Sequence, residues 1–371
     1  MLLEDVLQRG RNNFDLLRLI AACMVVIGHS YAFYPQSGWD PLLVLTHHES
    51  TGSLAVFCFF LISGMLVSAS WERDPVVWRY LLHRAARLWP ALLVNTLLLA
   101  LLIVPLWDSD RSYGQMLGLP QLWRWLLHVV LLGNAEVLAV PHSFVSSHLP
   151  YYPNPVVWTL PIELKAYLFV LVLGLIGSRD HAWRFWLALA LALAGLGQMT
   201  LHPSAIAFWA DWGRRAIGYT APPILLFLVG ILLYRWRRQV PIHAWPVPLL
   251  GIAAYMLRDS VFGEALWLST WMLLLLWLAA WPALRRWAPA EDRSYGVYLY
   301  AFPVQQMLAC LSPHLNHWLS LILVLPATWT LAGWSWHFVE RPALRWAQSY
   351  GAGRSLIRNS CLCPPPKQIG G

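Results

Sequence analysis

The sequence predicts an all-α, polytopic membrane protein. Of its 371 residues, 58% are apolar and only 12% are charged, whereas a soluble domain is about half apolar and about one quarter charged. A chain with so few charges cannot cover its apolar surface in water. Its apolar residues also fall into runs close to the roughly 20 residues that a spanning helix needs. Soluble enzymes, disordered chains and nucleic-acid-binding proteins are therefore disfavoured, in spite of the net charge of +8.

About ten apolar runs follow one another along the chain, and we interpret each as a transmembrane helix. They cover residues 14–34, 52–71, 88–107, 156–177, 183–201, 216–234, 245–258, 264–282, 294–312 and 317–338. A further apolar stretch, near 122–133, is too short to span comfortably. We predict that it forms a short re-entrant or interfacial helix.

The distribution of basic residues supports this topology. With a cytoplasmic N-terminus and ten spans, most of the 26 basic residues fall on the cytoplasmic side. If 122–133 also crossed, the cluster of arginines at 235–238 would face outward. Because cytoplasmic loops carry an excess of Lys and Arg, we predict that both termini are cytoplasmic. The positive charge then records topology and requires no anionic partner.

The chain divides into a membrane domain and a tail. Residues 1–345 form the membrane domain, and residues 346–371 form a cytoplasmic tail that we expect to be disordered. The long polar stretch 134–155, rich in Pro, His, Ser and Tyr, faces the outer side in this topology. Long loops on a rigid scaffold often carry function, so this loop is a candidate binding surface.

The first span contains two ionisable groups, which are costly in a membrane and indicate function. Arg18 and His29 are 11 residues apart, which is about three helical turns, so they share one face and lie roughly 16 Å apart along the axis. Arg18 then lies near the cytoplasmic boundary and His29 in the outer half of the membrane. In the alternative, structural interpretation Arg18 pairs with Asp15, and His29 fills a packed polar spot.

A second basic pair precedes the third span. Arg84 and Arg87 are one helical turn apart at the cytoplasmic edge. Guanidinium groups in this arrangement can bind phosphate in bidentate fashion. The alternative is an ordinary positive flank of a transmembrane helix.

The fourth span contains a carboxylate. Glu163 lies one turn from Tyr167, at the depth estimated for His29. A carboxylate and an imidazole at the same depth can form an orienting pair for proton transfer. Alternatively, Glu163 pairs with Tyr167 or with Lys165, although residues two positions apart do not share a helix face.

The last two motifs are weaker. The segment RSYGVYLY at 293–300 opens the ninth span with Ser294 as a supporting residue, and by itself it indicates a belt of interfacial tyrosines. The segment FVERP closes the last span, with Pro342 as a helix stop. No catalytic serine elbow, HExxH pair or phosphate-binding glycine loop is present. The five cysteines form no metal-type cluster, and we predict no metal site.

In order and spacing these segments resemble the membrane acyltransferase-3 family, which acylates cell-surface polysaccharides and some small molecules. The matching segments are FDLLRLIAACMVVIGH, FFLISGMLVS, RAARLWP, VVWTLPIELKAYLF, SYGVYLYAFPV and FVERP, within residues 10–345. Many relatives have a His after the YLY stretch, where this chain has Ala301. Some relatives carry a C-terminal esterase-like domain, and we expect this chain to act without one.

The resemblance implies an O-acyltransferase of the bacterial inner membrane. It implies transfer of an acyl group, which we expect to be acetyl, from cytoplasmic acyl-CoA to a hydroxyl of a glycan or lipid-linked sugar. No cofactor is bound permanently, acyl-CoA is a cosubstrate, and no nucleic acid is involved. The implied site residues are His29 and Glu163 for catalysis, Arg18, Arg84 and Arg87 for donor binding, and Asp15, Tyr167 and Ser294 as supporting residues.

Two other functions remain open at this point. A transporter or flippase could use the buried Arg, His and Glu side chains as a relay. A structural subunit of a polysaccharide-export complex could use them for helix packing. The sequence also leaves open the acceptor, and whether His29 carries the acyl group covalently or acts as a base.

Overall fold

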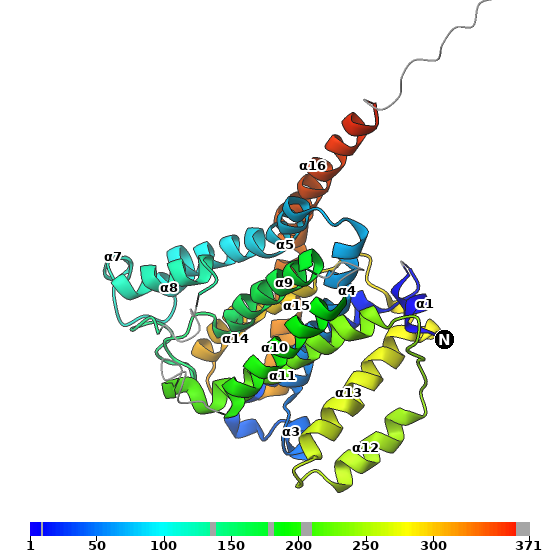
Figure 1. Cartoon of the computed structure of the whole chain (residues 1–371). Coiled ribbons are helices and arrows are strands. Elements are labelled where there is room, and N and C mark those ends of the chain that lie inside the picture. The colour runs from blue at the N-terminus through cyan, green and yellow to red at the C-terminus, as the bar shows by residue number, and fades with distance from the viewer. Residues whose placement is uncertain (9, 134–138, 177–181, 202–209, 361–371) are drawn as a thin grey trace, which may run out of the picture.

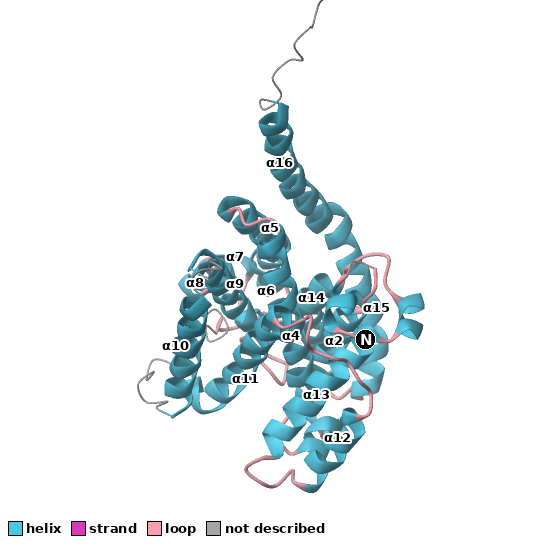
Figure 2. Cartoon of the chain, turned by 45° about the vertical axis from the view of Figure 1, so that its right-hand side comes forward, coloured by secondary structure: helices cyan, strands magenta, loops and turns pink. Residues whose placement is uncertain are grey.

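The computed structural model describes residues 1–360 except residues 9, 134–138, 177–181 and 202–209. All regular elements among the described residues are helices, apart from one isolated bridge between Leu2 and Pro241 (Figure 2). The predicted all-α class is therefore confirmed. The α-helices are α1 (Leu3–Leu7), α2 (Phe14–Phe33), α3 (Pro41–Thr46), α4 (Thr51–Arg73), α5 (Val77–Leu98), α6 (Val104–Leu106), α7 (Tyr113–Leu117), α8 (Pro120–Val130), α9 (Thr159–Ile176), α10 (Ala182–Leu201), α11 (Ala210–Arg235), α12 (Pro246–Met256), α13 (Gly263–Ala280), α14 (Ser294–Leu311), α15 (His317–Ser335) and α16 (Arg341–Ser360).

The helices have the length and composition of a polytopic membrane protein. Six segments among the described residues are long and apolar enough to cross a membrane: Phe14–Phe33, Thr51–Arg73, Val77–Leu106, Pro155–Ile176, Gly263–Ala280 and His317–Tyr350. Shorter apolar helices cover Trp183–Ala194, Ala221–Arg235 and Pro246–Met256. A helix lies in each of the ten predicted runs. The shortest, α12, has 11 residues, which gives a length of about 16 Å, roughly half of a bilayer core.

Helix α14 occupies the centre of the bundle, where it packs against α2 and α15 (Figures 1 and 2). The interpretation of its tyrosines as an interfacial belt was wrong, because Tyr295, Tyr298 and Tyr300 are each only 7% exposed. Two of these hydroxyls find acceptors inside the protein: that of Tyr295 donates to the Leu88 carbonyl (2.8 Å) and that of Tyr298 to the Val156 carbonyl (2.7 Å). A tyrosine satisfied in this way can be buried.

Close approach of α4 and α11 depends on two glycines. A Cβ atom at Gly64 would lie 2.3 Å from the carbonyl oxygen of Phe227, and one at Gly230 would lie 2.5 Å from that of Leu61. Small residues commonly allow helix backbones to meet in membrane proteins. This contact fixes α4, one wall of the pocket described below.

The short apolar stretch near 122–133 contains helix α8, which runs back along α5 (Figure 1). The indole nitrogen of Trp89, midway along α5, donates to the Val130 carbonyl at the end of α8 (3.0 Å). Leu122, Trp125 and Val129 lie on one face and are buried. With 11 residues, α8 is shorter than a spanning helix, as predicted for this stretch.

The last helices differ from the prediction. α15 continues through a π-helical segment, Trp336–Glu340, directly into α16, which projects from the bundle (Figures 1 and 2). Pro342 therefore does not end the helix: it is the second residue of α16, where a missing N–H group is tolerated next to the π-helical turn. Residues 346–360, which we expected to belong to a disordered tail, are helical, and 361–371 lie outside the described residues.

Candidate functional site

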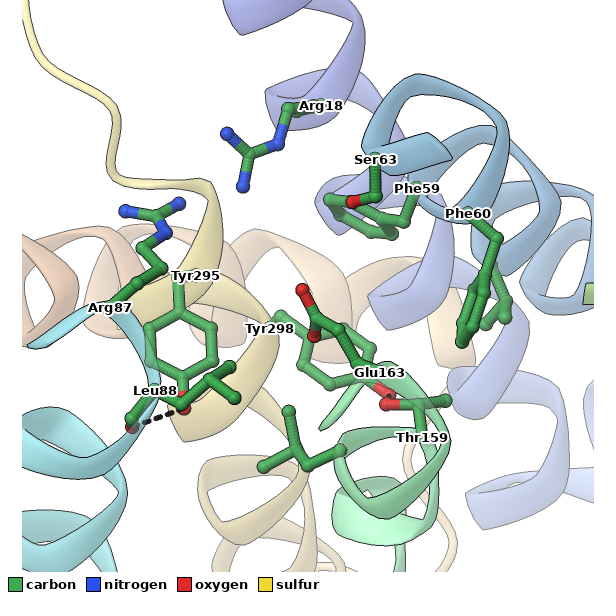
Figure 3. A pocket seen from close by; sticks show the side chains of 12 residues that line it. Arg18, Phe59, Phe60, Ser63, Arg87, Leu88, Thr159, Glu163, Tyr295 and Tyr298 are labelled. Carbon is green, nitrogen blue, oxygen red and sulfur yellow. Dashed lines mark hydrogen bonds between the residues drawn. The ribbon is translucent and has the colours of Figure 1, made fainter. Parts of the chain in front are cut away.

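A pocket lies at the centre of the bundle, lined by side chains from α2, α4, α5, α9 and α14. The lining residues are Arg18, Val56, Phe59, Phe60, Ser63, Arg87, Leu88, Thr159, Leu160, Glu163, Tyr295 and Tyr298. Figure 3 shows the guanidinium groups of Arg18 and Arg87 and the carboxylate of Glu163 pointing toward the same space.

The two pocket arginines are bridged by one carboxylate. Oδ2 of Asp292 accepts from Nη1 of Arg18 at 2.9 Å and from Nη2 of Arg87 at 2.7 Å. The other oxygen, Oδ1, accepts from the hydroxyl (2.5 Å) and the backbone N–H (3.2 Å) of Ser294. Asp292 is therefore attached to the first turn of α14 through one oxygen and to both arginines through the other.

The charge of Asp292 follows from these contacts. Asp292 lies in the loop before α14, outside the membrane-spanning helices. Burial opposes ionisation of its carboxyl group, but the guanidinium groups of Arg18 and Arg87, together with the two bonds from Ser294, hold its pKa well below the usual range. Asp292 is therefore a carboxylate at neutral pH, and the bridge is ionic.

Arg87 has two further partners. Its guanidinium carbon lies 5.5 Å from the ring centre of Tyr295, and its Nη1 lies 3.7 Å from Oε2 of Glu340. Glu340 is 2% exposed, and its other oxygen accepts from the Ser335 hydroxyl at 3.0 Å. Glu340 sits in the π-helical turn before α16, and such turns are frequent at functional sites.

Arg84 differs from the other two arginines. Its guanidinium carbon lies 5.3 Å from the ring centre of Tyr167 and 5.8 Å from that of Tyr80. Its Nε is buried without a hydrogen-bond partner. Within the described residues Arg84 makes no ion pair, so its charge is not compensated by a carboxylate as those of Arg18 and Arg87 are.

Glu163 is held by Tyr167, whose hydroxyl donates to its Oε1. Tyr167 is buried, and its backbone carbonyl accepts from the Tyr80 hydroxyl at 2.8 Å. This is the structural alternative in which Glu163 pairs with its neighbour one turn away. Lys165, the other alternative partner, is exposed.

The expected pair between His29 and Glu163 is not formed. Glu163 lines the pocket that contains Arg18, whereas Nδ1 of His29 is buried without a partner and the ring packs edge-on against Phe302 at 5.3 Å. Phe302 lies one helical turn beyond Tyr298, which closes the pocket on that side. The prediction failed because Glu163 lies in the pocket with Arg18, Tyr295 and Tyr298, beside the first turns of α2 and α14, whereas His29 lies three turns farther along α2.

The other predicted residues take different positions. Asp15 is exposed, and Arg18 bonds to Asp292 and not to Asp15, so the structural alternative named the wrong partner. Ser294 is fully buried and, as described, holds Asp292. Sequence reasoning missed Asp292 itself, although it lies two residues before Ser294. The signal that could have found it is an acidic residue directly before one span in a chain whose other spans contain or adjoin arginines that lack an acidic partner.

Two neighbouring loops carry backbone strain. Six non-glycine residues among the described ones have positive φ, and four of them lie in two neighbouring loops: Asp108 (47°), His142 (68°), Phe144 (53°) and Tyr151 (71°). Oδ2 of Asp108 accepts from the Ser146 N–H at 2.7 Å and joins the two loops. Conformations of this kind persist only where the surroundings enforce them, and they are common at functional sites.

In the parts of the chain that the structure describes, no three His, Cys, Asp or Glu side chains are grouped so that they could hold a metal ion. The pocket instead offers guanidinium groups for anions, an acidic side chain and hydroxyl groups.

Comparison with known proteins gives a consistent result. A family model described as "Acyltransferase domain", that of acyltransferase-3, matches residues 11–337. A protein named nodulation protein 10 from Rhizobium leguminosarum bv. viciae is 29% identical over 94% of this chain and 97% of its own length. An O-acetyl transferase from Shigella phage Sf6 is 27% identical over 89% of this chain and 95% of its own length. No solved structure matches the chain.

Proposed function

The chain belongs to the acyltransferase-3 family and is an O-acyltransferase, and from this premise we propose that it transfers an acetyl group from cytoplasmic acyl-CoA to a sugar hydroxyl. The acceptor we propose is a cell-surface or exopolysaccharide sugar, free or lipid-linked. The observation that carries the proposal is the pocket in which Arg18 and Arg87 face Glu163 inside a membrane bundle. Charged groups at such a position are costly and are kept for a function.

We propose the bacterial inner membrane as the location, with ten spans and both termini in the cytoplasm. Helices in all ten predicted runs and the cluster of Arg235, Arg237 and Arg238 support this orientation. In this orientation α2 and α14 begin on the cytoplasmic side, and the pocket residues Arg18 and Tyr295 lie in their first turns, toward the compartment that contains acyl-CoA.

The donor binds through its phosphates in this proposal. Arg84 pairs with no carboxylate of the described residues, which supports its binding a phosphate group, and Arg18 and Arg87 line the pocket. The extended arm of the donor then runs along α2 toward His29, roughly 16 Å farther along the helix axis. Glu163 lies beside this path, where its charge compensates the guanidinium groups.

His29 is the proposed general base. It takes the proton of the acceptor hydroxyl while the hydroxyl oxygen attacks the thioester carbonyl carbon. The carbon–sulfur bond then breaks, and the proton passes to the thiolate, which leaves as the free thiol. Its ring is only partly buried, and its Nδ1 makes no hydrogen bond to the described residues, which supports this role. In the covalent alternative the acyl group rests on His29 before the sugar accepts it.

The acceptor approaches from the outer side in this proposal. The described part of the loop 134–155 folds over the outer half of α14, where the Gln306 side chain donates to the Leu149 carbonyl at 2.6 Å. The strained residues of this loop support a binding role. Asp15, exposed at the start of α2, has a supporting role at the opposite, cytoplasmic end.

The test uses the purified full-length protein in detergent with radiolabelled acetyl-CoA. We expect acetyl-CoA binding and slow hydrolysis without an acceptor, and loss of an acetyl ester from surface glycans, measured by mass spectrometry, when the gene is deleted. A transporter or a structural subunit would neither bind nor hydrolyse acetyl-CoA. That result, with unchanged glycans in the deletion strain, would overturn the proposal.

A further inference from the structure

Asp292 has no assigned role, although it contacts both arginines of the pocket. Its Oδ2 lies 2.9 Å from Arg18 and 2.7 Å from Arg87, and the chain separation between Asp292 and these partners exceeds 200 residues in each case. The bridge therefore links α2, α5 and the start of α14 at one point. The contact is well shielded, because the three side chains are only 21%, 14% and 18% exposed for Arg18, Arg87 and Asp292.

The guanidinium groups of Arg18 and Arg87 both lie within 3 Å of one oxygen of Asp292, and they need an anion between them to stay this close to each other. Like charges at such short range repel, and the repulsion is strong where water is largely excluded. A carboxylate oxygen that accepts from both removes the repulsion. It uses one N–H of each arginine, and each guanidinium has five such donors, so most remain available to the pocket that both side chains line.

Asp292 is fixed and does not behave as a mobile counter-ion. Oδ1 accepts from the hydroxyl and the N–H of Ser294, which is 0% exposed in the first turn of α14. If the Asp292 carboxylate only filled the place of a donor phosphate, it would have to move away each time the donor binds. The two bonds from Ser294 oppose that movement, which favours a permanent structural position over displacement by the donor.

We propose that Asp292 is a positioning residue that holds Arg18 and Arg87 as a rigid pair directed at the anionic part of the acyl donor. This inference rests on the proposed function, because it assumes a donor with phosphate groups. Asp292 does not itself touch the donor. Its role is to fix the spacing and direction of two phosphate-binding side chains, since binding is tighter when the groups that bind are ordered beforehand.

The test is the substitution Asp292→Asn, with Glu291→Gln as the matched control. Glu291 is the neighbouring acidic residue, with a similar exposure of 23%, but it pairs with Arg293 and does not contact the pocket arginines. We measure kcat and KM with acetyl-CoA and with acetyl-pantetheine, which lacks the phosphates. We expect Asp292→Asn to raise the KM for acetyl-CoA about tenfold or more, while kcat and the KM for acetyl-pantetheine change less than twofold. Glu291→Gln should leave all values unchanged.

The direction of the KM change separates the alternatives. If Asp292 were a competitor of the phosphates, its removal would lower the KM for acetyl-CoA, and that result overturns the proposal. An equal rise of KM for both donors, or a loss confined to kcat, overturns it as well. If Asp292→Asn does not fold, Asp292→Glu decides: it keeps the charge but displaces it, so the same donor-selective rise of KM is expected, and an unchanged KM refutes the role.

The proposed function is tested separately by the wild-type protein in the same assay. If the wild-type protein transfers no acetyl group, the proposed function fails. If it transfers the group and Asp292→Asn keeps the wild-type KM values, only the role of Asp292 fails.

Discussion

Replacing Arg87 should destabilise the protein far more than replacing Arg84, one turn earlier on the same helix. Arg87→Gln leaves Glu340, which is 2% exposed, without its cationic partner at 3.7 Å. Asp292 keeps Arg18 as a partner. Breaking a buried ion pair costs roughly 3–5 kcal/mol, and because one of the two carboxylates stays paired we expect the lower end, about 3 kcal/mol.

Arg84→Gln is the matched variant. Arg84 loses only its contacts with the rings of Tyr80 and Tyr167, at 5.8 and 5.3 Å. Each such contact contributes about 0.5–1 kcal/mol, so the loss is about 1 kcal/mol. In a chain of this size 1 kcal/mol shifts the melting temperature by roughly 2 °C. The expected decreases are therefore about 6 °C for Arg87→Gln and about 2 °C for Arg84→Gln, also by that relation.

The assay is thermal unfolding of the purified protein in detergent, followed by intrinsic tryptophan fluorescence, because the chain has 24 tryptophans. The acetyl-CoA affinity is measured on the same samples. We expect Arg84→Gln to lose affinity at near wild-type stability, and Arg87→Gln to lose both. Equal melting temperatures for the two variants, or a greater loss with Arg84→Gln, would refute the argument that Arg87 neutralises buried carboxylates and Arg84 does not.

Three further predictions concern other parts of the molecule. His29→Ala should reduce acetyl transfer by at least about 100-fold, the typical contribution of a general base, while acetyl-CoA binding by isothermal titration persists; full transfer by this variant excludes the mechanism. Gly64→Ala should lower the melting temperature by several degrees, because its Cβ would lie 2.3 Å from a backbone oxygen of α11, whereas Gly114→Ala, with nothing within 4 Å, should not. The third prediction concerns pH. Burial raises the pKa of Glu49, in the loop before α4, to about 7, and the nearby charge of Glu264 adds to this effect, whereas a side-chain hydrogen bond with Ser53 lowers the pKa. The folded state then binds this proton more tightly than the unfolded state, so stability should fall by about 3 kcal/mol as pH rises from roughly 4.5 to roughly 7 and level off above it. Glu49→Gln should abolish this decrease, measured as the melting temperature at a series of pH values. An unchanged decrease would show that Glu49 is not its cause.

The fold was predictable because hydrophobic run length is a direct consequence of bilayer thickness. Every predicted run contains a helix, and 122–133 contains a helix too short to cross. The continuation of the last helix through Pro342 was not predictable in the same way. Residue preferences mark Pro342 as a stop, but a π-helical turn of five residues precedes it and lets the helix continue.

The site was predictable only in part, because its assembly depends on contacts between distant helices. Arg18 and Glu163 were selected as costly charges in apolar runs and Arg87 as one of a basic pair before a run, and the structure brings all three into one pocket. Asp292, the partner of the two arginines, was missed because it lies in a loop outside the predicted apolar runs. The tyrosines at 295 and 298 were assigned to the interface because composition does not show that buried carbonyl groups accept their hydroxyl protons.

The charges around the pocket support the proposal that a polyanionic donor is recognised inside a membrane bundle. An uncompensated charge is costly in this environment, and a compensated set is tolerated when its partners are close. Asp292 and Glu340 compensate two of the three arginines within ion-pair distance, and the third is compensated by no carboxylate among the described residues. That third residue, Arg84, is supported only by aromatic rings. The ion pairs of Arg18 and Arg87 thus stabilise the free protein, whereas in the proposed function Arg84 contributes to phosphate binding with little effect on stability. Stability and donor affinity should therefore separate between the Arg87 and Arg84 variants.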